Sequence, residues 1–324
     1  MKKLTEFIKV AYGYAKVYSY DIYRFVRFSG TLRTRTHPAT RGALMTKYYH
    51  MVEKGLALPQ PRPGFGAEMT KDLGDQMERA MRDGICAHEV QLSADALDTY
   101  MAFNAEMGTP SPSHVTQSVV SARNAGFAPS GSALKHMKVR QQDSEIHLAF
   151  LRSRSSVRGF GDGAVPQQVL LKAAQAAQFA PCVCNRQAGR LYFLTTEEQK
   201  RKALSYQKGN RGFGDTAAVI AIVTVDIAEM LEPTERYQHW IDGGLFAQNF
   251  LLGIHAQGYG ACPLNWSAPI TRDIGIRKLG YIPDSESIIM MVAIGPLKDE
   301  YSVARSERRP LADIAHFPDL EHKQ

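Results

Sequence analysis

Two long apolar runs limit the folds that this chain can adopt. They are Ala217–Asp226 (AAVIAIVTVD) and Ser287–Ile294 (SIIMMVAI), and both are rich in β-branched or long apolar side chains. A strand exposed on one face alternates apolar and polar residues, whereas a continuous apolar run suits a strand buried on both faces. Helices must then cover both faces of the sheet. The two runs therefore predict a three-layer α/β core.

Helical patterns and strand-like segments alternate around these two runs. Pro166 suits the first turn of a helix, because its missing N–H is not needed there. The segment from Gly258 to Trp266 contains a second glycine and Pro263, and it indicates a stiff turn at which the backbone approaches a ligand closely. The predicted helices here are 145–152, 166–179, 236–256 and 271–279, and a further strand is predicted at 191–195.

The first 143 residues have a different pattern, in which helices are separated by loops. A length of 324 residues fits two domains, since a domain has about 100–200 residues. We therefore predict a helical N-terminal region over 1–143 and a second domain over 144–324. Within the first region, Ser93 is expected to cap a helix, and residues 107–143 are expected to form loops. The predicted helices are 3–28, 42–54, 67–83 and 94–106.

The positive charge of the chain is concentrated at its start. The formal net charge is +7, and residues 1–41 hold nine Lys/Arg against Glu6 and Asp21, which also gives +7. Nucleic-acid binding would need a reading motif as well as charge, and no such motif is present. Helix 3–28 carries an apolar stripe, so it could lie on an anionic membrane surface. We favour the alternative that it packs on the second domain or across a dimer.

Other function classes are excluded by what the chain lacks. Its four cysteines are too few for a disulfide framework and contain no second pair for zinc, so no metal site is expected. The longest uninterrupted apolar run is Ala217–Val223, whereas a membrane-spanning helix needs about 20 residues. The charged start, Met1–Glu6, does not resemble a signal peptide. We therefore expect a cytoplasmic protein with free thiols.

Three segments carry residues suited to ligand chemistry. Residues 152–160 contain three arginines and three serines. Guanidinium groups and hydroxyls donate the hydrogen bonds that a phosphate accepts. The alternative interpretation is a solvated basic turn. Asn185 and Gln187 offer amide donors and acceptors that suit the mixed edge of a heterocycle, unless they close an Asx-type turn. A late basic cluster lies at 305–310, and it too could be a solvated surface.

The order of these segments resembles that of the FMN-dependent nitroreductase family. The resemblance covers residues 144–316, a little over half of the chain, and its strength lies in several matches in one order. The matching pieces are Arg154-x-Ser156-x-Arg158-x-Phe160, Val165-Pro166, Ala180-Pro181 with Asn185-x-Gln187, Trp240-Ile-Asp242-x-Gly244 with Gln248-Asn249, Gly258-x-Gly260-x-Cys262-Pro263, and Arg309-Pro310-Leu311.

The resemblance implies FMN-binding residues in four segments. Phosphate, ribityl chain and pyrimidine edge would be held by Arg154, Ser155, Ser156 and Arg158. Asn185 would hydrogen-bond the isoalloxazine, and Gln187 would support the ribityl side. Pro263, Leu264 and Asn265 would lie along the ring, with backbone N–H groups near N5 and O4. The phosphate site would be completed by Arg309 with Arg305 or Arg308.

The resemblance also implies a fold, an activity and an assembly. The fold would be a nitroreductase-like three-layer sandwich with a central mixed sheet. Hydride would pass from NADH or NADPH through FMN to an acceptor such as a nitro compound or a quinone, in alternating half-reactions, with no catalytic side chain because flavin N5 carries the chemistry. The protein would be a homodimer with each FMN at the subunit interface.

Two other functions are compatible with the same residues. One is a specialised flavin dehydrogenase or oxidase of a biosynthetic pathway, which would suit the large N-terminal extension. The other is a non-catalytic flavin-binding scaffold. In either enzyme, residues 1–143 are expected to cap or narrow the flavin cleft and so influence the choice of substrate.

Overall fold

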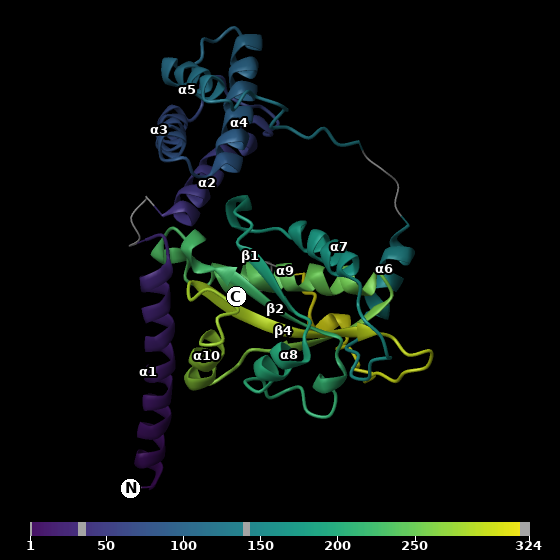
Figure 1. The fold of residues 1–324 in the computed structure, drawn as a ribbon. Coiled ribbons are helices and arrows are strands. Elements are labelled where there is room, and N and C mark those ends of the chain that lie inside the picture. Colours follow the sequence, from purple (N-terminus) through teal and green to yellow (C-terminus); the bar gives the residue numbers. More distant parts are fainter. Residues whose placement is uncertain (1, 32–36, 139–142, 318–324) are drawn as a thin grey trace, which may run out of the picture.

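A computed structural model describes residues 2–31, 37–138 and 143–317 (Figure 1). The second part of the chain is built around a four-stranded sheet in the order β1-β2-β4-β3. Its strands are β1 (Gly189–Leu194), β2 (Val219–Asp226), β3 (Tyr259–Asn265) and β4 (Glu286–Pro296). Its helices are α6 (Ser144–Ser153), α7 (Gln167–Gln178), α8 (Glu197–Leu204), α9 (Gln238–His255) and α10 (Ile270–Arg277).

Strand β2 is buried on both faces, as its sequence predicts. Ile220 and Ile222 belong to one apolar cluster with residues of α8 and α10. Val219, Ala221 and Val223 belong to a second cluster with residues of α7 and α9. In Figure 1 these two helix pairs lie on opposite sides of the sheet. The predicted three-layer α/β class is therefore confirmed.

The direction of the strands differs from the mixed sheet that the resemblance implies. All three pairings between the named strands are antiparallel. A parallel contact occurs as an isolated bridge between Ser156 and Ala261, outside the named strands. Strand β3 was expected to be a glycine-rich turn, and this expectation is wrong. Its residues are held in extended form by seven register pairs with β4, which local sequence does not reveal.

The helices α2 (Pro38–Leu56), α3 (Ala67–Asp83), α4 (Ala87–Glu106) and α5 (Ser113–Asn124) form a region with its own apolar core. Helix α5 lies in a segment expected to be loops, and its buried Val115, Val119 and Ala122 share one face. The expected cap at Ser93 is also wrong. Ser93 lies inside α4, where its hydroxyl donates to the Glu89 carbonyl at 2.6 Å.

Helix α1 (Lys2–Phe28) is separate from this helical core and docks on the second part of the chain. The Tyr20 hydroxyl donates to Asp273 at 2.7 Å, and the Arg24 guanidinium donates to the carbonyls of Asp284 and Glu286, both at 2.9 Å. Phe25 packs on a small apolar cluster around Val225. The domain boundary at residue 143 stays a prediction. Among the described residues, no helix is long and apolar enough to cross a membrane.

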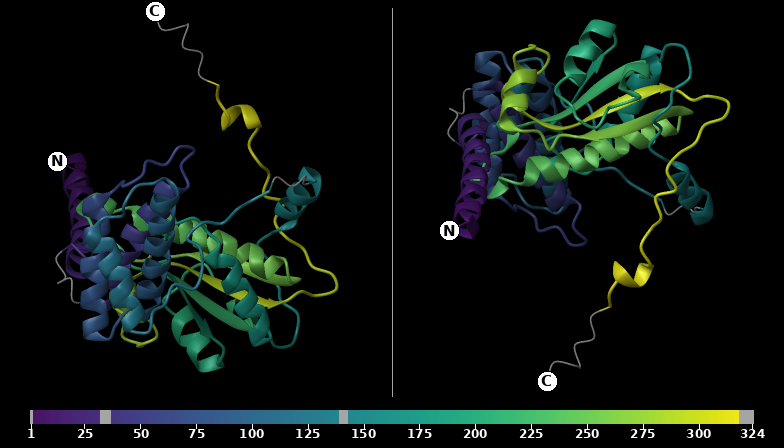
Figure 2. Two further views of the ribbon diagram at one scale, coloured as in Figure 1. Left: turned by 90° about the horizontal axis from the view of Figure 1, so that it is seen from above. Right: turned by 90° about the horizontal axis from the view of Figure 1, so that it is seen from below.

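The C-terminal segment after β4 leaves the body of the molecule (Figure 2). Residues 299–317 are exposed throughout, although they include large apolar side chains. Leu311 is 75% exposed and Phe317 is 96% exposed. Side chains of this kind usually pack against something, so this segment is a candidate for contact with another molecule.

Candidate active site

The structure brings the first arginine segment to the free edge of β3. Arg154 ends α6 in an extended conformation, and the chain then runs beside the strand. The Val157 N–H donates to the Ala261 carbonyl at 3.0 Å, next to the bridge between Ser156 and Ala261. Arg154 and Ser155 line a small cavity of about 80 Å³ together with Ala261 and residues of α9. Two guanidinium groups and two hydroxyls thus lie along one sheet edge.

This contact also fixes which backbone groups of β3 face outward. In an antiparallel strand, both backbone groups of every second residue point to the same side. Since the Ala261 carbonyl is bonded on the side away from β4, Pro263 and Asn265 direct their backbone groups the same way. Pro263 has no N–H to donate, which suits a sheet edge. The N–H of Asn265 is therefore an outward donor, whereas that of Leu264 belongs to the ladder with β4.

The charges of Arg154 and Arg158 affect the pKa values of residues in β3 and α9. Burial raises the pKa of the Cys262 thiol, while Arg158 and Arg154 act in the opposite direction. The pKa of His255, at the end of α9, is lowered by partial burial and by the charge of Arg154. His255 contacts the Ser153 hydroxyl at 2.7 Å. The region is positively charged and favours an anion such as phosphate.

The second predicted segment is a loop with an unusual backbone. Cys184, Asn185 and Gln187 all have positive φ angles, of 48°, 54° and 53°. Each is a non-glycine residue in the left-handed region, a conformation that costs free energy and persists only where the surroundings enforce it. Such conformations cluster at functional sites. The loop presents the amides of Asn185 and Gln187, which contact each other at 3.4 Å.

Buried charges hold this loop in place. Arg186 is 5% exposed, and its guanidinium donates to the Glu229 carbonyl at 2.5 Å and to the Glu235 carboxylate at 2.9 Å. The Asp242 carboxylate accepts from the Val183 N–H at 3.2 Å, and burial raises its pKa. Removing the Glu235 carboxylate would leave the buried charge of Arg186 unpaired. These anchors explain why the left-handed residues keep their conformation.

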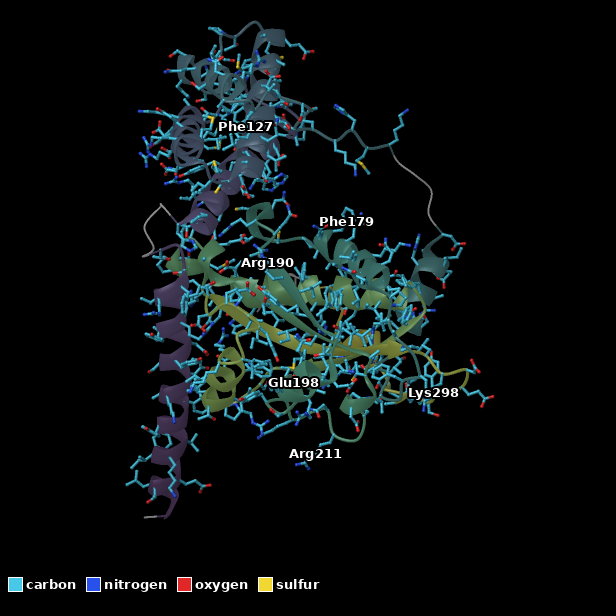
Figure 3. The ribbon with its side chains drawn as sticks, in the orientation of Figure 1. Phe127, Phe179, Arg190, Glu198, Arg211 and Lys298 are labelled. Carbon is cyan, nitrogen blue, oxygen red and sulfur yellow. The ribbon has the colours of Figure 1, made fainter. Side chains whose placement is uncertain are left out.

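Two cavities flank the loop. One, of about 630 Å³, lies between α7 and the edge strand β1 and includes Gln187 and Phe193 in its lining. The other, of about 350 Å³, lies between the loop and the helical region. Its lining includes Gly42, Tyr49 and Glu89 of the helical region and Asn185, Gln187, Arg190 and Glu229 of the second part. Figure 3 shows Arg190 on the side that faces the helical region.

Within one chain, the arginine segment beside β3 and the loop that contains Asn185 and Gln187 lie far apart. Gly189, next to the loop, pairs with Val225 at one end of the sheet, whereas Ala261 pairs with Ile294 at the other end. The two residues lie on opposite edge strands. Three strand spacings across and six residues along correspond to roughly 25 Å. The family resemblance assigns both Asn185 and Arg158 to the flavin ring system. Because their segments lie at opposite edges of the sheet, a single chain does not bring them together.

The C-terminal arginines are not brought to the first segment either. Arg305 pairs with Glu307, and Arg308 donates to the Ser306 carbonyl at 2.9 Å. Arg309 is exposed. In the part of the chain that the structure describes, no hydrogen bond or ion pair joins them to Arg154. The segment does begin at the site, since Tyr301 and Val303 line the small cavity beside Arg154.

The sequence did not reveal the residues that anchor the loop or line the second cavity without being predicted ligands. Arg186 lies between the two predicted ligands, yet its partner Glu235 is 49 residues further on. Asp242 lies in the Trp240–Gly244 motif, which gives the one clue to its importance. Nothing in the sequence points to Arg190 and Glu229, whose ion pair at 2.6 Å lies in the wall of the second cavity.

Comparison with known families identifies this part of the chain. The model of the nitroreductase family matches residues 151–208 and 202–296. Residues 151–296 therefore form a domain of the nitroreductase family. The class that the fold and this match define for residues 151–296 is that of the nitroreductase family, and further helices precede this part of the chain.

Solved structures with similar folds were also found. An FMN-dependent nitroreductase from Clostridium difficile is 22% identical, with 53% of this chain and 99% of that chain covered and a TM-score of 0.44. A Desulfovibrio desulfuricans protein in complex with FMN is 25% identical, with coverage of 55% and 100% and a TM-score of 0.45. A nitroreductase-like protein from Streptococcus mutans is 17% identical, with coverage of 55% and 100% and a TM-score of 0.47.

The buried carboxyl of Glu229 generates a prediction about pH. Burial raises its pKa to about 7, although Arg190 acts in the opposite direction. In the unfolded chain it loses its proton near pH 4.5, so between these values only the folded state keeps the proton. Stability is therefore lost as pH rises from about 4.5 to 7. Glu229→Gln should remove this loss. The difference in the free energy of unfolding, variant minus wild type, should therefore be about 1–3 kcal/mol larger at pH 8 than at pH 5.

Urea unfolding at pH 5, 6, 7 and 8 measures this difference. Glu198→Gln is a suitable control, because Glu198 is exposed and its pKa is lowered, by Lys202. An equal dependence on pH in wild type and in Glu229→Gln would contradict the raised pKa of the buried Glu229 carboxyl.

Proposed function

We propose that this protein is an FMN-dependent oxidoreductase that takes hydride from NADH or NADPH and passes two electrons to a second substrate. The observation that carries the proposal is the edge of β3. There Arg154, Arg158 and two serine hydroxyls lie in the segment that contacts Ala261, on the strand edge that also carries Pro263 and Asn265. This donor set fits a group with an anionic phosphate and a hydrogen-bonding ring.

The chemistry would belong to the flavin, and the protein would bind and orient it. FMN supplies a ring atom, N5, that accepts and delivers hydride. Arg154 with Ser155 and Ser156 would hold the phosphate and ribityl chain, and Arg158 would place a fixed positive charge at the pyrimidine edge. The outward N–H of Asn265 would donate along the ring. Nitro compounds and quinones are acceptor classes that suit such a site.

We further propose that two copies of the chain build each site. Gly189, next to the loop with Asn185 and Gln187, lies roughly 25 Å from Ala261 of β3, so a partner would supply the loop to the arginine segment. The exposed C-terminal segment, with Leu311 and Phe317, provides apolar surface for such a contact. In the dimer, Arg309 with Arg305 or Arg308 would reach the phosphate. A homodimer with FMN at the interface accounts for both separations.

Anaerobic titration tests the activity. The purified protein, loaded with FMN, should show flavin absorbance that is bleached by a stoichiometric amount of NADPH or NADH. A quinone or a nitroaromatic compound should then restore the absorbance. Bleaching by an organic substrate but not by either nicotinamide would favour the biosynthetic dehydrogenase. Bound FMN that no donor bleaches would favour the scaffold, and a protein that cannot bind FMN would contradict all three functions.

Arg154 and its neighbour Arg152 provide a matched pair for the phosphate site. Arg154 is partly buried at the β3 edge, whereas the side chain of Arg152 is 70% exposed on α6. Hydrogen bonds to charged groups contribute about 1.5–3 kcal/mol, so Arg154→Ala should raise the FMN dissociation constant about 10- to 150-fold. Arg152→Ala should change it less than threefold. Fluorescence titration measures both, and equal effects would contradict the assignment.

The helical region has a place in this proposal as a wall of the acceptor site. Asn185 and Gln187, the proposed flavin ligands, line the 350 Å³ cavity together with Gly42, Thr46 and Tyr49 of α2. An acceptor in this cavity would contact both the helical region and the flavin-binding loop. The helices would then decide which acceptors fit.

Gly42 tests this role. The three atoms nearest to a Cβ at this position belong to the Glu89 side chain, at 3.4 Å or more, so Gly42→Leu should fold and fill part of the cavity. We expect KM for a bulky naphthoquinone to rise at least fivefold and KM for 1,4-benzoquinone to change less than twofold. The rate of flavin reduction by the nicotinamide should not change. Equal effects on both quinones would show that the cavity does not hold the acceptor.

A further inference from the structure

Helix α1 carries an apolar stripe that the rest of the chain leaves uncovered. Residues 4–19 are exposed throughout, and the helix projects beyond the body of the molecule (Figure 1). The stripe recurs every three to four residues, so its members share one face. They are Leu4, Phe7, Ile8, Tyr14, Tyr18 and Ile22, each between 57% and 69% exposed. A continuous stripe of this kind indicates an interaction surface.

The polar anchors of α1 lie away from the stripe, whereas Phe25, which shares the face of the stripe, packs on the apolar cluster around Val225 at the docked end. The helix is anchored by Tyr20, which bonds Asp273, and by Arg24, which bonds the carbonyls of Asp284 and Glu286. At 3.6 residues per turn, these two side chains lie roughly 140–180° around the helix from the centre of the stripe. The body of the protein therefore covers this face at Phe25 and leaves the stripe residues from Leu4 to Ile22 exposed.

The charge of α1 selects the kind of surface. The helix contains six Lys/Arg and two acidic residues, a net charge of +4, and of the acids Asp21 is next to Arg24 and Asp273 at the docked end. Lys9 and Lys16 lie on the side opposite the stripe, where they would stay in water. Pairing with α1 of a second copy would bring two helices of charge +4 together. An anionic surface is instead attracted to this charge.

The exposed aromatic residues agree with a lipid surface. Tyr12, Tyr14, Tyr18 and Tyr23 are between 56% and 69% exposed. A tyrosine ring has an apolar body and a polar tip, and such rings gather at membrane–water interfaces. We propose that α1 lies in the surface of an anionic membrane, with its stripe facing the acyl chains, and that it holds the oxidoreductase domain at that surface.

Vesicle sedimentation with the whole chain tests this proposal. Wild type should bind vesicles of phosphatidylcholine and phosphatidylglycerol in equal parts at least fivefold more strongly than vesicles of phosphatidylcholine alone. The difference should shrink at 0.5 M NaCl, since salt screens the attraction. Equal binding to the two vesicle types, or no binding to either, would overturn the proposal.

Ile8 and Val17 form a matched pair for locating the contact. Both are exposed and β-branched, at 57% and 49%, but Val17 lies roughly 120° around the helix from the centre of the stripe. Ile8→Asp should lower vesicle partitioning at least tenfold, and Val17→Asp less than threefold, although both change the charge equally. Circular dichroism checks that both variants keep their helix. Equal losses would overturn the proposal, and so would an Ile8→Asp variant that binds vesicles normally but has lost a dimer.

Discussion

The central strands β2 and β4 are covered on both faces, and this determines where the protein can bind anything. Their side chains fill the two apolar clusters beneath the helices, so polar ligand-binding groups are confined to the sheet edges and the loops beside them. The edges are β1 and β3, which lie three strand spacings apart. The arginine segment lies along β3, and the left-handed loop precedes β1. A flavin site that uses both edges must therefore combine two chains.

The same constraint explains what the sequence could and could not predict. The continuous apolar runs of β2 and β4 predicted the layered core, because burial on both faces leaves a direct mark on composition. Strand β3 is an edge strand with Gly260 and Pro263 inside it, so its composition resembles a turn, and its extended form comes from pairing with β4. Helix α5 was missed for a similar reason, since only three of its residues enter the helical core.

The candidate site was predictable as residue types but not as an arrangement. Arg154, Asn185 and Arg309 stand out through their motifs, and their roles as flavin ligands stay a prediction. The buried partners that hold the loop, Glu235 and Asp242, lie more than 45 residues from it in sequence. In the proposed dimer, the location of Arg309 would depend on a contact with the partner chain. Local patterns carry no information on such distant pairings.

The N-terminal residues add two different features to a nitroreductase domain. Helices α2–α5 have their own core, and residues of α2 and α4 line a cavity together with the loop of Asn185 and Gln187. Helix α1 is joined to the domain through polar contacts near Asp273 and Glu286 and through Phe25, which packs on the cluster around Val225. The first feature would affect which acceptor is reduced, and the second would affect where in the cell reduction occurs.

Complementation between two defective chains tests the shared site most directly. Arg154→Ala and Asn185→Ala alter the two edges, so at an FMN concentration that just saturates wild type each homodimer should bind little FMN and have low activity. When the two variants are produced together, random pairing gives mixed dimers that contain one intact site. The account predicts recovery of about one quarter of the wild-type sites, seen as bound FMN and as activity. Activity no greater than the mean of the two variants alone would contradict it, because every site would then lie within one chain.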